Sequence, residues 1–170
     1  KLYEKEIKEA IERVFLSGRY TLADEVDSFE TEFASYIGCK YGIGVGNATD
    51  GLTLALKALN IKEGDEVITT PFTAIPTVSA IIDSGATPVF VDVCEDTYLI
   101  DLKKISAAIT DKTKAIMPVH LFGNVVDIRK LRNIVDDIPI IEDASQSHGS
   151  KIDNIQSGSM GDLSVFSFYP

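Results

Sequence analysis

Apolar side chains in the first part of the chain recur three or four positions apart, the spacing of helices with one buried face. The first series begins close to the first residue and consists of Ile7, Ile11, Val14 and Phe15. Ser17 and Gly18 interrupt it, and a second helix is predicted over residues 24–36, with Gly38 as its stop. Residues 1–37 are therefore expected to form an amino-terminal helical segment.

From residue 38 onward, short apolar runs alternate with helical patterns. Strands are predicted over residues 41–45, 66–70, 87–91, 115–119, 139–142 and 163–168. Helices are predicted over residues 49–59, 75–84, 102–108 and 127–135. This alternation is typical of repeated strand–helix–strand units, in which the strands run parallel. We predict one α/β domain over residues 38–170, built on a mostly parallel sheet flanked by helices.

Composition, charge and cysteine content exclude several classes of protein. The chain has 170 residues, 45% of them hydrophobic, which is enough for the buried core of one domain. A net charge of −10 disfavours sequence-independent binding to nucleic acid, which requires basic side chains against phosphates. No apolar run reaches the roughly 18 residues of a membrane span. Cys39 and Cys94 match no metal-binding spacing, so a reducing cytoplasm is the simplest setting.

The loop of residues 44–51, with the sequence GVGNATDG, leads from a predicted strand into a predicted helix. Asn47 is a favourable N-cap residue, and Asp50 can bond back to it in a variant of the capping box. The backbone N–H groups of Thr49 and Asp50 would be open to a phosphate, whose charge the helix dipole favours. The alternative is an ordinary capped helix that binds nothing. A nicotinamide-dependent oxidoreductase is disfavoured, because the glycine pattern is incomplete and the next strand ends without an acidic residue.

Two acidic residues, Glu142 and Asp143, follow apolar residues at the end of a predicted strand. Burying a carboxylate costs free energy unless a cation or hydrogen-bond donors compensate, so such a residue should face a specific partner. The alternative is that Asp143 caps the next segment while Glu142 is solvated. Ser167, between Phe166 and Phe168 in the last predicted strand, could place its hydroxyl against a ligand oxygen.

The histidines and serines give little sign of metal or hydrolase chemistry. His120 and His148 lie far apart in sequence without cysteines at ligand spacing. Each is expected to be a hydrogen-bonded structural residue, or a support for a neighbouring site residue, rather than a metal ligand. No Gly-x-Ser-x-Gly motif follows a predicted strand, which disfavours a hydrolase with a catalytic triad.

The order and wording of these segments resemble the DegT/DnrJ/StrS family of sugar aminotransferases, which use pyridoxal 5'-phosphate (PLP), over nearly the whole chain. The matching segments are GNATDGL (46–52), GDEVIT (64–69), GATPVFVD (85–92), PVHLFG (118–123), IEDASQ (141–146) and FSFYP (166–170). The resemblance implies the large domain of a fold-type I PLP-dependent transferase, truncated in this chain. It also implies a homodimer, with each active site built partly by the neighbouring subunit.

The resemblance implies a role for each matching site residue. The backbone N–H groups of Thr49 and Asp50 and the hydroxyl of Ser167 would bind the cofactor phosphate. Asp143 would pair with the pyridine nitrogen, a role that Asp or Arg commonly fills in PLP enzymes. Gln146 would lie near the phenolic oxygen of the ring.

Two features depart from the family pattern. Ala74 stands where many relatives have an aromatic residue that stacks on the cofactor, so its methyl group is expected to touch the ring face, with Phe72 as a substitute. The Schiff-base lysine of the relatives is expected just after Pro170, together with a last large-domain strand and a small domain. Without that lysine the chain is expected to be inactive, because the amine anchors the cofactor and moves the proton.

The implied reaction of the parent enzyme moves an amino group from glutamate to a keto-sugar linked to a nucleotide. The segment TAIPT at residues 73–77 favours a dTDP-linked keto-deoxysugar that feeds polysaccharide or natural-product synthesis. Two alternatives stay open. One is a PLP-dependent sugar dehydratase, in which a histidine replaces the lysine, and the other is a regulatory relative without catalysis.

Overall fold

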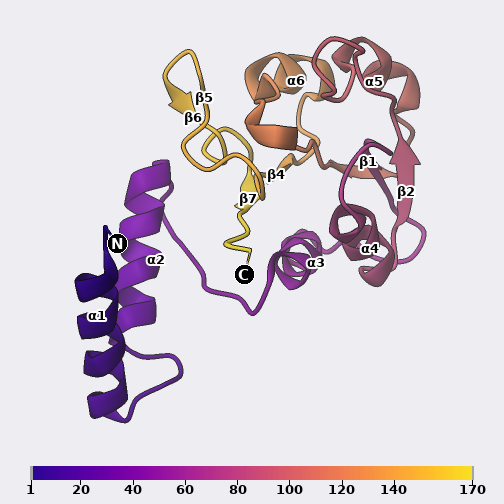
Figure 1. Ribbon diagram of the computed structural model, residues 1–170. Coiled ribbons are helices and arrows are strands. Elements are labelled where there is room, and N and C mark those ends of the chain that lie inside the picture. The colour runs from indigo at the N-terminus through magenta and orange to yellow at the C-terminus, as the bar shows by residue number, and fades with distance from the viewer. Residues whose placement is uncertain (1, 170) are drawn as a thin grey trace. The chain divides into compact units, whose positions relative to one another are not determined.

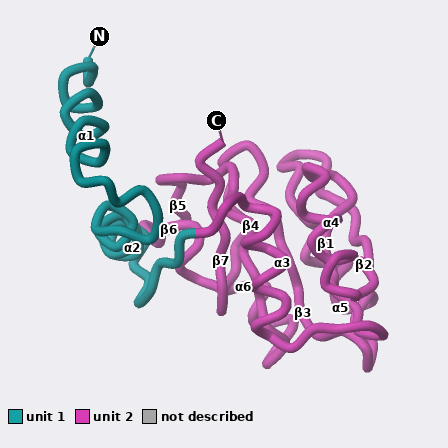
Figure 2. Tube along the Cα trace, turned by 90° about the horizontal axis from the view of Figure 1, so that it is seen from below, with its two compact units in different colours: residues 1–44 teal, residues 45–170 magenta. Residues whose placement is uncertain are grey.

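The computed structural model of the chain describes residues 2–169. The chain divides into two compact units, Lys1–Gly44 (unit 1) and Val45–Pro170 (unit 2), which Figure 2 shows in different colours. None of the helices in the described part is both long and apolar enough to span a bilayer.

Unit 1 contains the two helices predicted from the apolar spacing, α1 (Glu4–Ser17) and α2 (Asp24–Ile37). Both helices end at a glycine in the left-handed conformation, Gly18 at φ 67° and Gly38 at φ 90°, where a side chain would be strained. Along α1 every side chain stays at least partly exposed, so its apolar stripe is open to solvent within this unit.

The prediction of a strand over residues 41–45 is wrong. These residues follow α2 as an extended segment that pairs with no strand in the described part of the chain. The N–H of Gly44 donates to Oε1 of Glu30 in α2 at 2.5 Å, and a Cβ on Gly42 would lie 2.5 Å from the Glu30 carbonyl oxygen. The glycines thus allow a close approach to α2, and the alternating apolar residues that suggested a strand remain exposed.

Unit 2 has the predicted α/β class, with a parallel sheet. Its strands are β1 (Glu66–Thr69), β2 (Thr87–Phe90), β3 (Thr113–Ile116), β4 (Ile141–Asp143) and β7 (Leu163–Val165). Parallel pairing gives the order β2-β1-β3 in one group and β4-β7 in the other. Single parallel bridges, Ile116–Ile140 and Val119–Asp143, join β3 to β4. The order across the sheet is therefore β2-β1-β3-β4-β7.

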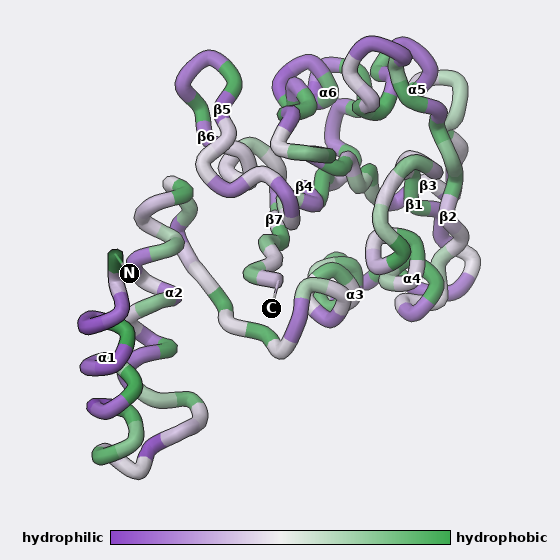
Figure 3. Tube along the Cα trace, in the orientation of Figure 1, coloured by the Kyte–Doolittle hydropathy of each residue, from purple (hydrophilic) through white to green (hydrophobic). Residues whose placement is uncertain are grey.

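Helices cover both faces of this sheet (Figure 1). They are α3 (Ala48–Ala58) and α4 (Ile75–Asp83) on one face, and α5 (Leu102–Ala108) and α6 (Ile128–Val135) on the other. Successive strand residues point to opposite faces, so Val67 packs with α3 and α4 while Ile68 packs with α5 and α6. Figure 3 shows the hydrophobic residues along the strands between these helix layers.

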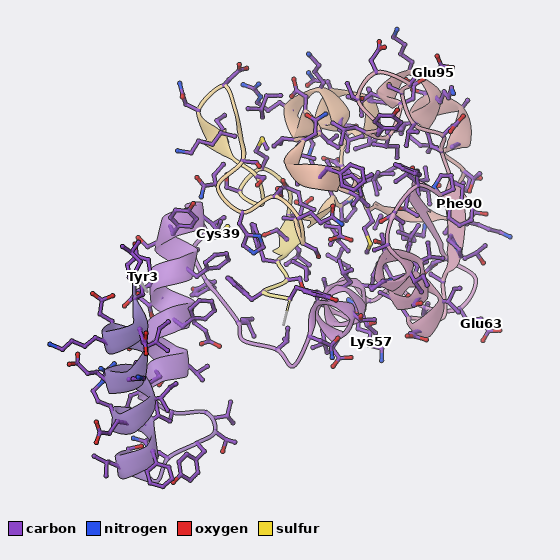
Figure 4. All side chains as sticks on the ribbon, viewed as in Figure 1. Tyr3, Cys39, Lys57, Glu63, Phe90 and Glu95 are labelled. Atoms are coloured by element: carbon purple, nitrogen blue, oxygen red, sulfur yellow. The ribbon has the colours of Figure 1, made fainter. Side chains whose placement is uncertain are left out.

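Two small elements were not predicted. Leu121–Gly123 forms a short 3-10 helix, η1, and a hairpin is formed by β5 (Lys151–Ile152) and β6 (Ile155–Gln156). The hairpin turn places Asp153 at φ 47° and Asn154 at φ 64°, as a two-residue turn with both central residues left-handed requires. Figure 4 shows the labelled Glu63, Phe90 and Glu95 at the outer edge of unit 2.

Candidate functional site

The carboxyl ends of the central strands meet at one edge of the sheet in unit 2. The chain goes from β1 to β2 on one side and then returns to β3 on the other, and ligands of α/β sheets bind beside such a reversal. Asp143 at the end of β4 is the register partner of Val165 at the end of β7. Helix α3 begins against β7, because a Cβ on Gly51 would lie 2.9 Å from Cγ1 of Val165. Helix α3 also contacts β4, so the strand end that carries Asp143 and the helix α3 lie in the same part of unit 2.

Asp143 is held by donors on both carboxylate oxygens, and only 4% of the residue is exposed. Thr77 in the first turn of α4 donates its hydroxyl to Oδ2 at 2.7 Å. Ser145 donates to Oδ1 through its hydroxyl at 2.6 Å and its backbone N–H at 3.2 Å. Asp143 thus caps the next segment, which was one of the two alternatives for this residue. It also has a distant partner, Thr77, which lies 66 residues away in sequence.

The alternative that Glu142 is solvated is wrong, because the residue is fully buried. The loop between β6 and β7 wraps around its carboxylate. Gly158 N–H donates to Oε2 at 2.8 Å, while the N–H groups of Met160 and Gly161 donate to Oε1 at 2.8 and 2.6 Å. Burial alone would raise the pKa of Glu142, but the hydrogen bonds from His120, Gly161 and Gly158 outweigh burial and hold the pKa below its ordinary value.

His120 is a buried, hydrogen-bonded residue, as the sequence predicted. Its Nε2 lies 2.7 Å from Oε2 of Glu142, and its Nδ1 accepts the N–H of Val126 at 3.1 Å. Because Nδ1 accepts a hydrogen bond, Nε2 is the ring nitrogen that donates to Glu142. The backbone N–H of His120 also donates to the Asp143 carbonyl at 3.0 Å, so this pair supports the strand end that carries Asp143.

His148 packs against aromatic rings near the carboxyl end of the described chain. Its ring centroid lies 5.2 Å from that of Phe166 and 5.0 Å from that of Phe168, both in edge-on geometry. Burial lowers the pKa of His148. Within residues 2–169 no group of three or more His, Cys, Asp or Glu side chains is placed to hold a metal ion.

The start of α3 forms the predicted cap, with one correction. Asn47 Oδ1 accepts the N–H of Asp50 at 2.9 Å, and Asn47 Nδ2 donates to Asp50 Oδ2 at 2.8 Å. The Asp50 N–H is therefore engaged rather than open, because the N-cap side chain takes the nearest free donor. Ser167 also differs from expectation. It follows the end of β7 instead of lying within a strand, because β4 offers no residue beyond Asp143 to pair with.

Gln146 is exposed next to η1, and its side-chain orientation is fixed. Its Oε1 accepts the N–H of Phe122 at 2.8 Å. Phe122 adopts a left-handed φ of 56°, which costs about 1–3 kcal/mol and directs this N–H toward the amide. The Nε2 group of Gln146 is then the side available to donate to a ligand oxygen.

The two candidates for the ring-stacking position, Ala74 and Phe72, have different neighbours. Ala74 is the N-cap of α4 and is exposed, and it precedes Thr77 by one helical turn. The ring of Phe72 instead contacts the rings of Tyr98 and Phe122, with centroids 5.7 and 6.4 Å away. Ala74 therefore lies nearer to Thr77, which binds Asp143, and it is the better candidate for the ring-stacking position.

Sequence reasoning missed the residues that support the site residues. Thr77 and Ser145 hold Asp143, and His120 holds Glu142. The cost of burying a carboxylate predicted that partners must exist, but no local pattern indicated which residues they are.

Comparisons of sequence with known proteins agree on one family. The model described as the DegT/DnrJ/EryC1/StrS aminotransferase family matches residues 1–170. The chain is 45% identical over 173 residues to a dTDP-3-amino-3,4,6-trideoxy-alpha-D-glucose transaminase of Micromonospora megalomicea subsp. nigra, covering 99% of the chain and 46% of that protein. It is 48% identical over 168 residues to a dTDP-3-amino-3,6-dideoxy-alpha-D-galactopyranose transaminase of Aneurinibacillus thermoaerophilus, covering 98% of the chain and 46% of that protein.

Comparison of structures gives the same result. The chain matches the crystal structure of S. venezuelae DesV with a TM-score of 0.96 at 41% identity, covering 99% of this chain and 46% of that one. The chain spans about half the length of the curated relatives and of the solved structure that it matches.

Proposed function

The chain belongs to the DegT/DnrJ/EryC1/StrS aminotransferase family, and on this premise we propose that the full-length protein is a PLP-dependent sugar aminotransferase. PLP is the cofactor of aminotransferases in this family. In the proposal glutamate donates the amino group and a dTDP-linked keto-deoxysugar accepts it. The acceptor is supported by the two curated relatives, whose names are those of dTDP-amino-sugar transaminases.

One observation carries the proposal: the buried Asp143 carboxylate stands at the end of β4, and α3, a helix with a capped start, packs on β4 and β7. A carboxylate that keeps its charge in such a place requires compensation, and the cationic ring nitrogen of PLP supplies it. The start of α3 offers a positive dipole end and the Thr49 N–H to the phosphate. In the proposal the two groups bind opposite ends of one cofactor, the carboxylate at the ring nitrogen and the helix start at the phosphate.

We assign roles to three further residues. Asp143 faces the ring nitrogen and keeps it protonated. Gln146 donates from Nε2 to the phenolic oxygen, because Phe122 occupies its Oε1. Ala74 provides a small surface against the ring face. When bound, PLP supplies the electron sink that lets an amino group pass between two carbon compounds.

At the phosphate end, we assign the Thr49 N–H and the Ser167 hydroxyl as donors. The Asp50 N–H donates to Asn47 Oδ1 at 2.9 Å. It becomes a third donor to the phosphate when this bond breaks. A phosphate that displaces the Asn47 side chain satisfies the same donor with a stronger, charge-assisted bond.

The remaining parts of the proposal concern the whole protein. A PLP-binding domain over residues 38–170 is completed by a Schiff-base lysine shortly after Pro170, a residue that lies outside those the structure describes. The functional form is a cytoplasmic homodimer, and the exposed apolar side chains of α1 support a further contact in the whole protein.

The test uses the full-length protein purified with added PLP. Visible absorbance from bound cofactor should appear, and glutamate alone should discharge it while releasing 2-oxoglutarate. Adding a dTDP-linked keto-deoxysugar should then give the amino sugar, measured by mass spectrometry. Loss of the sugar's hydroxyl without gain of nitrogen would favour the dehydratase, and a protein that takes up no PLP would contradict the proposal.

A further inference from the structure

A chain of hydroxyl groups runs from the loop before α4 to the Asp143 carboxylate. The Oγ1 atoms of Thr73 and Thr77 lie 2.7 Å apart, and Thr77 Oγ1 lies 2.7 Å from Asp143 Oδ2. Thr77 is 1% exposed and Asp143 is 4% exposed, so water does not compete for the bond between them. Because water does not replace either partner, the hydrogen bond holds the Thr77 hydroxyl and the Asp143 carboxylate in one relative orientation.

The direction of donation along this chain is determined by chemistry. An ionised carboxylate only accepts, so Thr77 must use its single hydroxyl proton toward Asp143. The Thr77 oxygen is then left to accept, and Thr73 must donate to it. Polarisation along such a chain strengthens the bond to the carboxylate.

The two oxygens of Asp143 are held by different kinds of partner. Ser145 lies two residues away in sequence and holds Oδ1 through a local turn. Thr77 lies 66 residues away, in the first turn of a helix on the face of the sheet, and holds Oδ2. Thr77 therefore fixes the carboxylate plane relative to α4, the helix whose N-cap is Ala74.

We propose that Thr77 is a positioning residue, whose hydroxyl, fixed by Thr73, aims the Asp143 carboxylate at the ring nitrogen of PLP. The inference rests on the proposed function, because it concerns the same cofactor site. With the carboxylate fixed before binding, the cofactor does not have to order it, and the ring nitrogen meets a preorganised acceptor.

The test compares Thr77→Val with Thr77→Ser in the full-length protein. The valine variant keeps the shape and removes the donor, and the serine variant restores the donor. Thr113→Val is the matched control, since Thr113 is also buried but lies at the opposite end of the sheet, where it accepts the Thr110 N–H. PLP affinity is measured by titration of the apoprotein, and the absorbance of bound PLP is followed against pH.

Thr77→Val should weaken PLP affinity about 10-fold, as expected for a lost bond to a charged group, and shift the pH profile of the absorbance. Thr77→Ser should restore both. Thr113→Val should lower the melting temperature and leave affinity and pH profile unchanged, which separates positioning from stability. If Thr77→Val does not fold, Thr73→Val decides the question, with an expected loss of about 3-fold.

Wild-type affinity and an unshifted pH profile in Thr77→Val, or in Thr73→Val where only that variant folds, would overturn the inference while leaving the proposed function intact. A wild-type protein that binds no PLP would overturn both, so the two failures are distinguishable.

Discussion

At Asp143, three donors converge on one buried carboxylate. The Thr77 hydroxyl donates to one oxygen, and the hydroxyl and N–H of Ser145 donate to the other. A site that fixes a buried charge in this way is suited to compensate a developing or resident positive charge at close range. The residue is therefore where a small chemical change should have a large functional effect.

Replacing Asp143 with Asn should lower kcat/KM for transamination by about 100-fold or more, because charge compensation of the ring nitrogen is lost. Asp65→Asn is the control, since the Asp65 side chain accepts the Lys62 N–H in the turn before β1, away from the candidate site. Steady-state kinetics of the full-length enzyme give the comparison, with circular dichroism to establish folding. A kcat/KM for Asp143→Asn within a few-fold of wild type would show that this carboxylate does not face the ring.

The sequence predicted the residue types of the site better than their contacts. An acid after buried apolar residues demands a partner, which made Glu142 and Asp143 candidates, but only the family resemblance distinguished Asp143 as the partner of the ring nitrogen. The partner Thr77 could not be identified, since it lies 66 residues away and its position depends on how α4 packs. Asp50 shows the converse, because the N-cap pattern at Asn47 is local, and in the structure the Asn47 side chain accepts the Asp50 N–H that was expected to be open.

At the scale of elements, the loop between β6 and β7 is organised by Glu142 more than by apolar packing. Backbone N–H groups from three positions in this loop point at one carboxylate. The strand end, the loop and His120 are thereby linked through a single side chain. Loss of the charge on Glu142 should loosen all of them together.

The pKa of Glu142 is lowered from its ordinary value of 4.5, so the unfolded chain binds this proton more readily than the folded one. The stabilising contribution is fully present above that ordinary value and is lost as the pH falls through the lower folded pKa. Urea unfolding at a series of pH values should therefore show a declining free energy of unfolding in the acid range.

Glu142→Gln should remove this part of the pH dependence and lower stability at neutral pH, because its amide group brings donors toward backbone donors. Glu95→Gln, at an exposed site, should keep the wild-type pH dependence. An unchanged acid limb in Glu142→Gln would mean that other carboxylates account for the effect.

Gly158 in the same loop has no room for a side chain. It adopts φ 85°, and an added Cβ would collide with the ring of Phe166. Gly158→Ala should cost about 2 kcal/mol or more of unfolding free energy, through backbone strain and the clash together. Gly64→Ala is matched in φ, at 92°, but meets nothing within 4 Å, so about 1 kcal/mol is expected. Equal losses in the two variants, measured by denaturant unfolding, would exclude the clash as a cause.

Helices were easier to predict than strands, for a physical reason. α5 begins and ends at the predicted residues, 102 and 108, because caps and apolar spacing are local signals. Residues 41–45 alternate like a strand, but a strand requires a partner that a local pattern does not reveal. The β5–β6 hairpin was missed because its strands have two residues each, too short for an alternating pattern.

At the scale of the whole molecule, the two apolar cores on either side of the sheet determine where a ligand can act. Both faces are covered by helices, so the open edge at the carboxyl ends of the strands is where a small molecule can reach the backbone. A ligand bound there would contact the start of α3 and the end of β7, which come from the first and the last part of unit 2 in sequence.

PLP should therefore stabilise the full-length protein as a whole. At a PLP concentration about 100 times the Kd, the expected gain is about 2.7 kcal/mol, which raises the melting temperature. Differential scanning fluorimetry of apoprotein with increasing PLP measures the shift, with pyridoxal lacking the phosphate as control. A melting temperature that responds equally to both compounds would argue against a phosphate contact at α3.

The close approach of Gly51 to Val165 means that the distance between α3 and β7 depends on the absence of a side chain at Gly51. With no side chain at Gly51, the first turn of α3 rests directly on β7, and a methyl group there would have to displace one of them. This contact thus fixes the spacing between the start of α3 and the end of β7. Cofactor analogues with one extra bond between ring and phosphate should not bind to the native protein. If they bind to Gly51→Ala, the spacing between α3 and β7 has increased in that variant.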